Sequence, residues 1–124
     1  MLCPLFGGEE RTASEAEFPP ARSCRYRWST RRVVLPPGPT RDHPLANPFG
    51  PDSPALDGVA LPPMLVVTAA NDLLRDRAAG YAARLKAMGK PVELMEFEVQ
   101  HHGFFPVEPY GNAGSEVVRL VKRT

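Results

Sequence analysis

Several features that would set this 124-residue chain apart from ordinary globular proteins are missing. No apolar run approaches the roughly 20 residues that a transmembrane helix needs, so we expect no membrane partner. The apolar start, from Met1 to Phe6, is too short for a signal peptide and lacks its basic beginning. Only two cysteines are present, Cys3 and Cys24. Because nothing indicates export, we expect reduced thiols in a cytoplasmic protein, with neither cysteine near a catalytic group.

The chain has almost no excess of either charge overall, although positive charge is concentrated in one segment. The formal net charge of +1 gives no general reason to expect a nucleic-acid partner. Between Glu17 and Asp42 there is no acidic residue, and five arginines crowd into residues 22–32. Since neither a helical nor a strand period accompanies these arginines, we interpret the segment as a solvated basic loop and expect no nucleic-acid binding.

The composition is otherwise that of one small folded domain, but proline is abundant and unevenly distributed. Twelve of the 15 prolines lie in residues 1–63. Each proline fixes φ and removes a backbone donor, which excludes long helices and central strands. Residues 1–63 are therefore predicted to be loop-rich, with the apolar stretch Leu2–Phe6 counted as a short strand.

The back half, residues 64–124, carries the pattern of a strand, a helix, a second strand and a second helix. Met64–Thr68 is a continuous apolar run rich in β-branched residues, which is typical of a strand buried on both faces. Val92–Phe97 alternates between apolar and polar residues and predicts the second strand. This order predicts an α/β fold with two to three parallel strands and two flanking helices.

Local signals place the ends of the two helices. Apolar residues recur at spacings of three and four from Leu74 to Met88, and Gly89 is expected to end that helix. A loop is predicted through residues 98–112, after which Ser115 is a suitable N-cap for the last helix. Both helices are expected to flank the sheet.

Two residues with acid–base chemistry follow the two predicted strands. Asp72 lies four residues past the first strand, and His102 lies five residues past the second. Because the carboxyl ends of parallel strands share one edge of a sheet, both side chains are expected at the same crevice. An aspartate there can fix the tautomer of the histidine and stabilise the imidazolium that forms when the histidine accepts a proton.

Structural roles are open alternatives for these residues. Asp72 also stands where the N-cap of the following helix is expected, and Asp76 is interpreted as a surface group near the start of that helix. His101 and His102 are adjacent, which invites a metal, but no third ligand stands at a useful spacing in the sequence. We therefore predict no metal site and no cofactor.

Four short segments, taken together and in order, resemble one enzyme family. Asn71-Asp-Leu-Leu-Arg-Asp76 and Gln100-His-His-Gly-Phe-Phe105 are similar to the closing motifs of the hormone-sensitive-lipase-like α/β-hydrolases, in particular the plant carboxylesterases. Residues 7–12 and 41–51 resemble two earlier loops of the same family. The resemblance implies a Ser-His-Asp mechanism that hydrolyses a small-molecule ester.

Matched to that family, Asp72 would be the acid of the triad and His102 the base. No serine stands in a G-x-S-x-G turn, and the H-G-G-G loop that stabilises the oxyanion is missing. Both would precede Met1 in a full-length relative, and residues 21–34 also depart from the family. The chain, residues 1–124, is therefore predicted to be a partial α/β-hydrolase domain that is inactive alone.

Two other interpretations remain open at this point. The gibberellin receptors of the same group bind a small molecule without catalysis, and the resemblance implies that they have lost the triad histidine. The retained His102 therefore argues against a receptor. The other interpretation is a truncated gene product without activity. The oligomeric state is not predicted.

Overall fold

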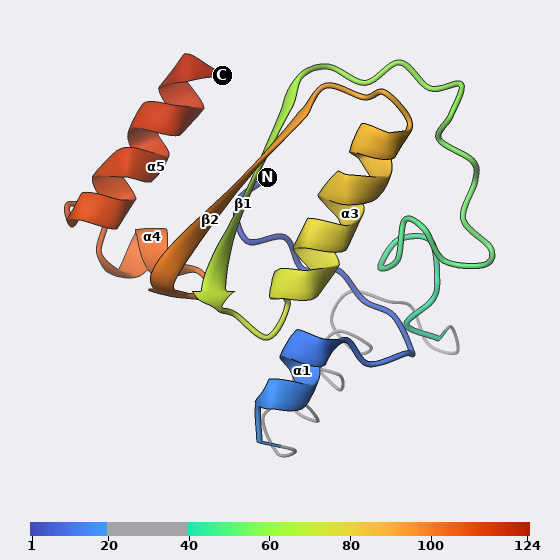
Figure 1. Ribbon diagram of the computed structural model, residues 1–124, viewed down its shortest axis with the longest axis horizontal. Helices are drawn as coiled ribbons and strands as arrows, with labels where there is room; N and C mark the ends of the chain where they lie inside the picture. The colour runs from blue at the N-terminus through green and yellow to red at the C-terminus, as the bar shows by residue number, and fades with distance from the viewer. Residues whose placement is uncertain (20–39) are drawn as a thin grey trace.

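The computed structural model describes residues 1–19 and 40–124. The arginine-rich residues 22–32, interpreted above as a solvated loop, and Cys24 lie outside the described residues. The described ranges contain, in order, α1 Ala13–Glu17, β1 Met64–Asn71, α3 Arg75–Ala87, β2 Val92–His101, α4 Phe104–Val107 and α5 Asn112–Arg123 (Figure 1). None of the helices in these ranges has the length and apolar character needed to cross a membrane.

The sheet consists of β1 and β2, which run parallel and pair along most of β1. The start of the chain adds a single parallel bridge between Leu2 and Val67, so the predicted strand Leu2–Phe6 is wrong beyond its first residues. Cys3 turns the backbone with a φ of 44°, and Pro4 has no N–H with which to continue a ladder. The predicted α/β class with a small parallel sheet is confirmed.

Helices cover both faces of this sheet, with α3 on one side and α4 and α5 on the other (Figure 1). Successive side chains of β1 point to opposite faces, as a strand requires. Leu65 and Val67 pack into a cluster with residues of α4 and α5, whereas Val66 packs against Ala78 and Ala82 of α3. The prediction that this strand is buried on both faces is confirmed.

The end of α3 follows the local signal in the sequence. The N–H of Gly89 donates to the carbonyl of Lys86 at 2.9 Å, and the N–H of Lys90 donates to the carbonyl of Leu85 at 3.0 Å. This pair of bonds is a Schellman motif, which needs a left-handed residue after the helix. Gly89 has a φ of 71°, and the prediction that it ends the helix is confirmed.

The chain after Phe97 differs from the predicted loop over residues 98–112. β2 continues to His101, which pairs with Asn71 after a shift in register, and α4 follows it directly. The prediction that Ser115 caps the last helix is also wrong, because its N–H donates to the carbonyl of Gly111 at 2.9 Å within α5. β2 continues past Phe97 because it pairs with the end of β1, although residues 98–101 do not alternate between buried and exposed positions.

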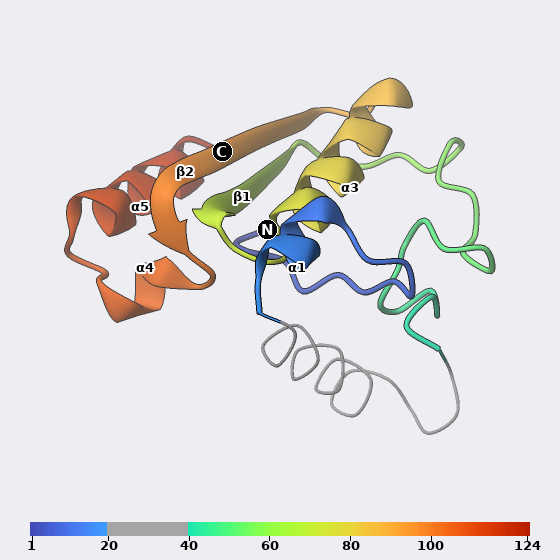
Figure 2. The ribbon, with the colours of Figure 1, turned by 60° about the horizontal axis from the view of Figure 1, so that its bottom comes forward.

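A buried ionic cluster connects α1 to α3, and Figures 1 and 2 show α1 next to the N-terminal end of α3. Thr12 and Glu15 form a capping box at the start of α1, a helix that the sequence analysis did not predict. Glu15 is fully buried and also accepts hydrogen bonds from Arg77 at 2.9 Å and Arg41 at 3.5 Å. Burial raises the pKa of Glu15, but these arginines and the N-cap hydrogen bond hold it below its ordinary value.

Candidate catalytic site

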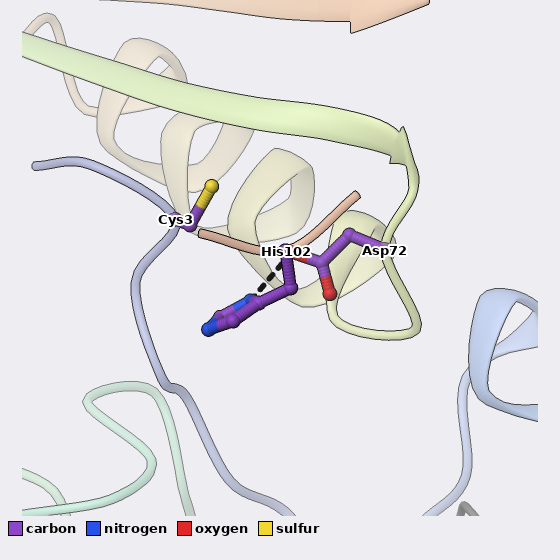
Figure 3. A group of neighbouring side chains, drawn as sticks. All are labelled: Cys3, Asp72 and His102. Atoms are coloured by element: carbon purple, nitrogen blue, oxygen red, sulfur yellow. Dashed lines mark hydrogen bonds and ion pairs between the residues drawn. The ribbon is translucent and has the colours of Figure 1, made fainter. Parts of the chain in front are cut away.

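The structure brings Asp72 and His102 together at the carboxyl ends of the two parallel strands. Asp72 directly follows β1 and His102 directly follows β2, which is longer than predicted. Nδ1 of His102 lies 2.8 Å from Oδ2 of Asp72 (Figure 3). The Asp72 side chain is 2% exposed and that of His102 is 45% exposed. A buried carboxylate thus holds one nitrogen of an imidazole whose remaining ring edge reaches the surface.

The N-cap role considered for Asp72 is not observed, and its two oxygens make two different contacts. Oδ1 of Asp72 accepts the backbone N–H of Leu74 at 2.8 Å, two residues along the chain. This is the local turn that aspartate side chains favour, and it precedes α3 without capping it, since Leu74 is the N-cap. The turn fixes the orientation of the carboxylate, so Oδ2 is held toward His102.

The neighbouring candidates Asp76 and His101 are directed elsewhere. Oδ2 of Asp76 accepts the backbone N–H of Ser14 at 2.7 Å, so Asp76, which was predicted to be a surface group paired with nearby arginines, also joins α1 to α3. Its other oxygen accepts a hydrogen bond from Arg75 at 3.3 Å. His101 is exposed and lies in the strand ladder opposite Asn71. Of the two aspartates, Asp72 is the one that contacts a histidine.

The hydrogen bond to Asp72 raises the pKa of His102; burial opposes this shift, and the negative charge of Asp72 adds to it. A histidine with a raised folded pKa stabilises the protein below its unfolded pKa. That contribution is lost as pH rises through the folded pKa. The charged imidazolium is thus favoured at this position.

We expect the His102 ring to titrate in NMR spectra above the ordinary midpoint of about 6.5. The reason is that the imidazolium is stabilised by the Asp72 carboxylate. Asp72→Asn removes the charge and is expected to lower the midpoint, and His102→Gln identifies the resonance by deleting it. A His102 midpoint at or below the ordinary value, or one that Asp72→Asn leaves unchanged, would contradict this electrostatic account.

Cys3 is a third member of the site, and the expectation that neither cysteine lies near a catalytic group is wrong for it. One donor atom from each of Cys3, Asp72 and His102 lies within 4.8 Å of the other two (Figure 3). The bridge between Leu2 and Val67 carries Cys3 to the same edge of the sheet. The edge argument that paired Asp72 with His102 does not find Cys3, because Cys3 lies inside the predicted strand Leu2–Phe6 and not after it.

The surroundings of Cys3 keep its thiol protonated. Burial raises the pKa of the Cys3 thiol, a hydrogen bond from the Gly103 backbone lowers it, and the negative charge of Asp72 raises it. The net direction is upward, so the thiol is a poor nucleophile at neutral pH. Within the described residues, no hydroxyl group is hydrogen-bonded to His102. Among the described residues, the site therefore offers a carboxylate and an imidazole but no activated nucleophile.

The cavity beside Asp72 and His102, which we call the dyad, is small. It has a volume of about 170 Å³, and Leu5, Phe18 and Leu73 form its apolar walls next to Asp72 and His102. Pockets that hold a small-molecule ligand usually measure about 300–1,000 Å³. A larger cavity of about 580 Å³ lies around α3 and the loops before β1, and neither member of the dyad lines it. The cavity that the described residues form beside Asp72 and His102 is thus smaller than a typical ligand pocket.

Comparisons with known proteins find relatives of this chain by sequence. A protein-family profile described as alpha/beta hydrolase fold matches residues 1–106. A gibberellin receptor of Arabidopsis thaliana is 42% identical over 110 residues, which is 85% of this chain and 31% of the receptor. Probable carboxylesterase 2 of Arabidopsis thaliana is 30% identical over 124 residues, which is 98% of this chain and 38% of that protein.

Solved structures agree with the sequence matches. A thermostable carboxylesterase cloned from a metagenomic library superposes with a TM-score of 0.78 at 32% identity, covering 96% of this chain and 40% of that chain. The predicted resemblance to plant carboxylesterases and their relatives is confirmed. The chain spans about a third of the length of the curated relatives that it matches.

Proposed function

Because the chain belongs to the α/β-hydrolase family, we propose that it supplies the acid and the base of a Ser-His-Asp ester hydrolase. Asp72 is the acid, His102 is the base, and the serine nucleophile comes from a segment outside these 124 residues. The observation that carries this proposal is the 2.8 Å contact between His102 Nδ1 and the buried Asp72 carboxylate. Residues 1–124 form part of one hydrolase domain in this proposal.

The dyad performs two proton transfers in such a reaction. Nε2 of His102, the ring nitrogen that does not contact Asp72, takes the proton of the serine hydroxyl as the serine attacks the ester carbonyl. Asp72 stays ionised, keeps the proton on Nδ1 and stabilises the imidazolium. His102 then gives its proton to the departing alcohol, and the raised pKa of His102 agrees with an imidazolium that is stabilised in this way.

An apolar groove along α5 supports the idea that further hydrolase residues pack against this chain. Leu2, Phe105, Val118 and Val121 line a groove of about 350 Å³ along α5. Val118 and Val121 are about half exposed, and among the described residues a single bridge at Leu2 is all that pairs with the other edge of β1. Such an edge needs another strand or a cover. We infer that the segment carrying the nucleophile continues the sheet here.

A receptor-like binding function is the second candidate. The 42% identity to a gibberellin receptor favours it, since that protein is named as binding a hormone. The Asp72–His102 pair favours hydrolysis, because a binding site has no need of a buried carboxylate that orients an imidazole. If a protein that contains this chain together with the missing part of the domain bound a small molecule without hydrolysing it, the receptor-like function would be supported.

The experiment compares the chain alone with a joined protein. The joined protein carries, before Met1, the part of the metagenomic carboxylesterase that this chain does not cover. We expect the chain alone to hydrolyse short-chain p-nitrophenyl esters no faster than buffer, because it lacks both nucleophile and oxyanion loop. The joined protein is expected to show saturable hydrolysis. A folded joined protein without activity, or a His102-dependent rate in the chain alone, would refute the proposal.

A further inference from the structure

Three chemically different donors meet at one corner of the fold. Cys3 follows the bridge at the chain start, Asp72 follows β1, and His102 follows β2. Their donor atoms lie within 4.8 Å of one another (Figure 3). Cys3 and Asp72 are buried, whereas His102 is exposed enough to be reached from solvent. The proposed hydrolysis uses two of these three residues and leaves Cys3 without a role.

This donor set selects one class of metal ion. A thiolate, an imidazole and a carboxylate together suit Zn²⁺, whereas Mg²⁺ and Ca²⁺ favour oxygen ligands. Zinc bonds of about 2.0–2.3 Å place two ligands of a tetrahedral ion roughly 3.5 Å apart. The upper limit of 4.8 Å on the spacing exceeds this value by about 1 Å, so ligation requires a movement of at most about that size to bring the ligands in. Three protein ligands leave a fourth position for water.

We propose that Cys3, Asp72 and His102 bind a zinc-class divalent ion through Sγ, a carboxylate oxygen and Nδ1. The ion takes the position of the proton that Nδ1 shares with Asp72, so metal binding and the Asp72–His102 hydrogen bond exclude each other. The Cys3 thiol also loses its proton to solvent as the bond between Sγ and the ion forms, so metal binding releases protons and tightens as pH rises. Zinc is thus a reversible inhibitor of the dyad. Metal binding does not depend on the proposed hydrolase function. The inhibition by zinc does depend on it, because it requires that Asp72 and His102 act in catalysis.

The surroundings already orient one of the ligands. The Leu74 N–H at 2.8 Å from Asp72 Oδ1 holds the carboxylate in place, so Oδ2 stays available for an ion. Outer hydrogen bonds of this kind fix the orientation of metal ligands. The cavity of about 170 Å³ beside His102 provides an approach for the ion.

The test titrates the full 124-residue chain with Co²⁺, the spectroscopic substitute for Zn²⁺. We expect one ion per chain, with thiolate-to-cobalt charge-transfer absorption that Zn²⁺ displaces. Loss of an outer hydrogen-bond partner of a metal site costs about 10–100-fold in affinity, so loss of a direct ligand is expected to cost at least about 100-fold. Cys3→Ser and His102→Gln are expected to show this loss.

Two matched variants control for non-specific binding. Cys24→Ser removes the other cysteine of the chain, and His101→Gln removes the adjacent histidine, which does not belong to the cluster. Both are expected to keep the parent affinity, with circular dichroism checking that each variant folds as the parent does. Absence of the charge-transfer band, or equal losses in Cys24→Ser and Cys3→Ser, would overturn the metal site.

A second measurement separates this proposal from the hydrolase proposal. In the joined protein, Zn²⁺ is expected to lower the esterase rate, a chelator to restore it, and Cys3→Ser to reduce the ratio of the rates without and with zinc. An inactive joined protein that still binds Co²⁺ through Cys3 would refute the hydrolase and leave the metal site. An active joined protein whose rate does not depend on zinc would refute the inhibition.

Discussion

In the joined protein, His102→Gln is expected to lower kcat by about 10⁶-fold, the loss that follows removal of the base from a serine triad. Glutamine keeps a polar side chain of similar reach but cannot accept the proton of the serine hydroxyl at neutral pH. Because the base acts only as the transition state is approached, the loss is expected in kcat and not in KM. Single-turnover and steady-state rates on a p-nitrophenyl ester measure it.

The matched control for this substitution is His43→Gln. His43 lies in the turns before β1, where its Nδ1 accepts the backbone N–H of Leu45 at 3.2 Å. It contributes nothing to the dyad, so kcat is expected to stay near that of the parent. A loss in His43→Gln comparable to that in His102→Gln would show that the effect comes from folding and not from proton transfer.

Asp72→Asn is expected to lower kcat by about 10⁴-fold, less than loss of the base. The asparagine oxygen can still accept the Leu74 N–H, so the turn before α3 is kept. Its amide group then donates to Nδ1 of His102, which places the imidazole proton on Nε2 and removes the base from the serine. The pH dependence of kcat and the NMR signals of the His102 ring report this change of tautomer.

Asp76→Asn provides the comparison for the acid. Asp76 stands on the same helix end but binds the Ser14 N–H and the Arg75 side chain. Its replacement is expected to lower the free energy of unfolding by weakening the contact between α1 and α3, while kcat of the folded protein is kept. If Asp76→Asn lost as much kcat as Asp72→Asn, the assignment of the acid would be wrong.

Local patterns in the sequence were sufficient for the elements that are buried or end in a glycine turn. Met64–Thr68 is apolar at every position but its last because it packs on two faces, and that run is visible without any partner. Gly89 marks the end of α3 because few other residues adopt its φ of 71° at low cost. Signals of this kind lie within a few residues of the feature that they predict.

The errors fall where pairing with a distant segment overrides the local pattern. The end of β2 at His101 depends on the partner residue Asn71, which lies 30 positions earlier. The start of α5 is an exception, because its N-cap is Gly111 and not Ser115, four residues further along the chain. No property of residues 98–115 considered alone distinguishes these outcomes from a loop.

The candidate site shows the same division between sequence and tertiary structure. Sequence alone determined that Asp72 and His102 follow parallel strands, and strand direction is enough to bring them to one edge. Only the tertiary structure decided that Oδ2 of Asp72 contacts Nδ1 of His102 and that Cys3 joins them. The side chain of Cys3 meets that of Asp72 across 69 positions of the chain because one backbone bridge sets the register. Distances between side chains depend on such registers, which no local run of residues specifies.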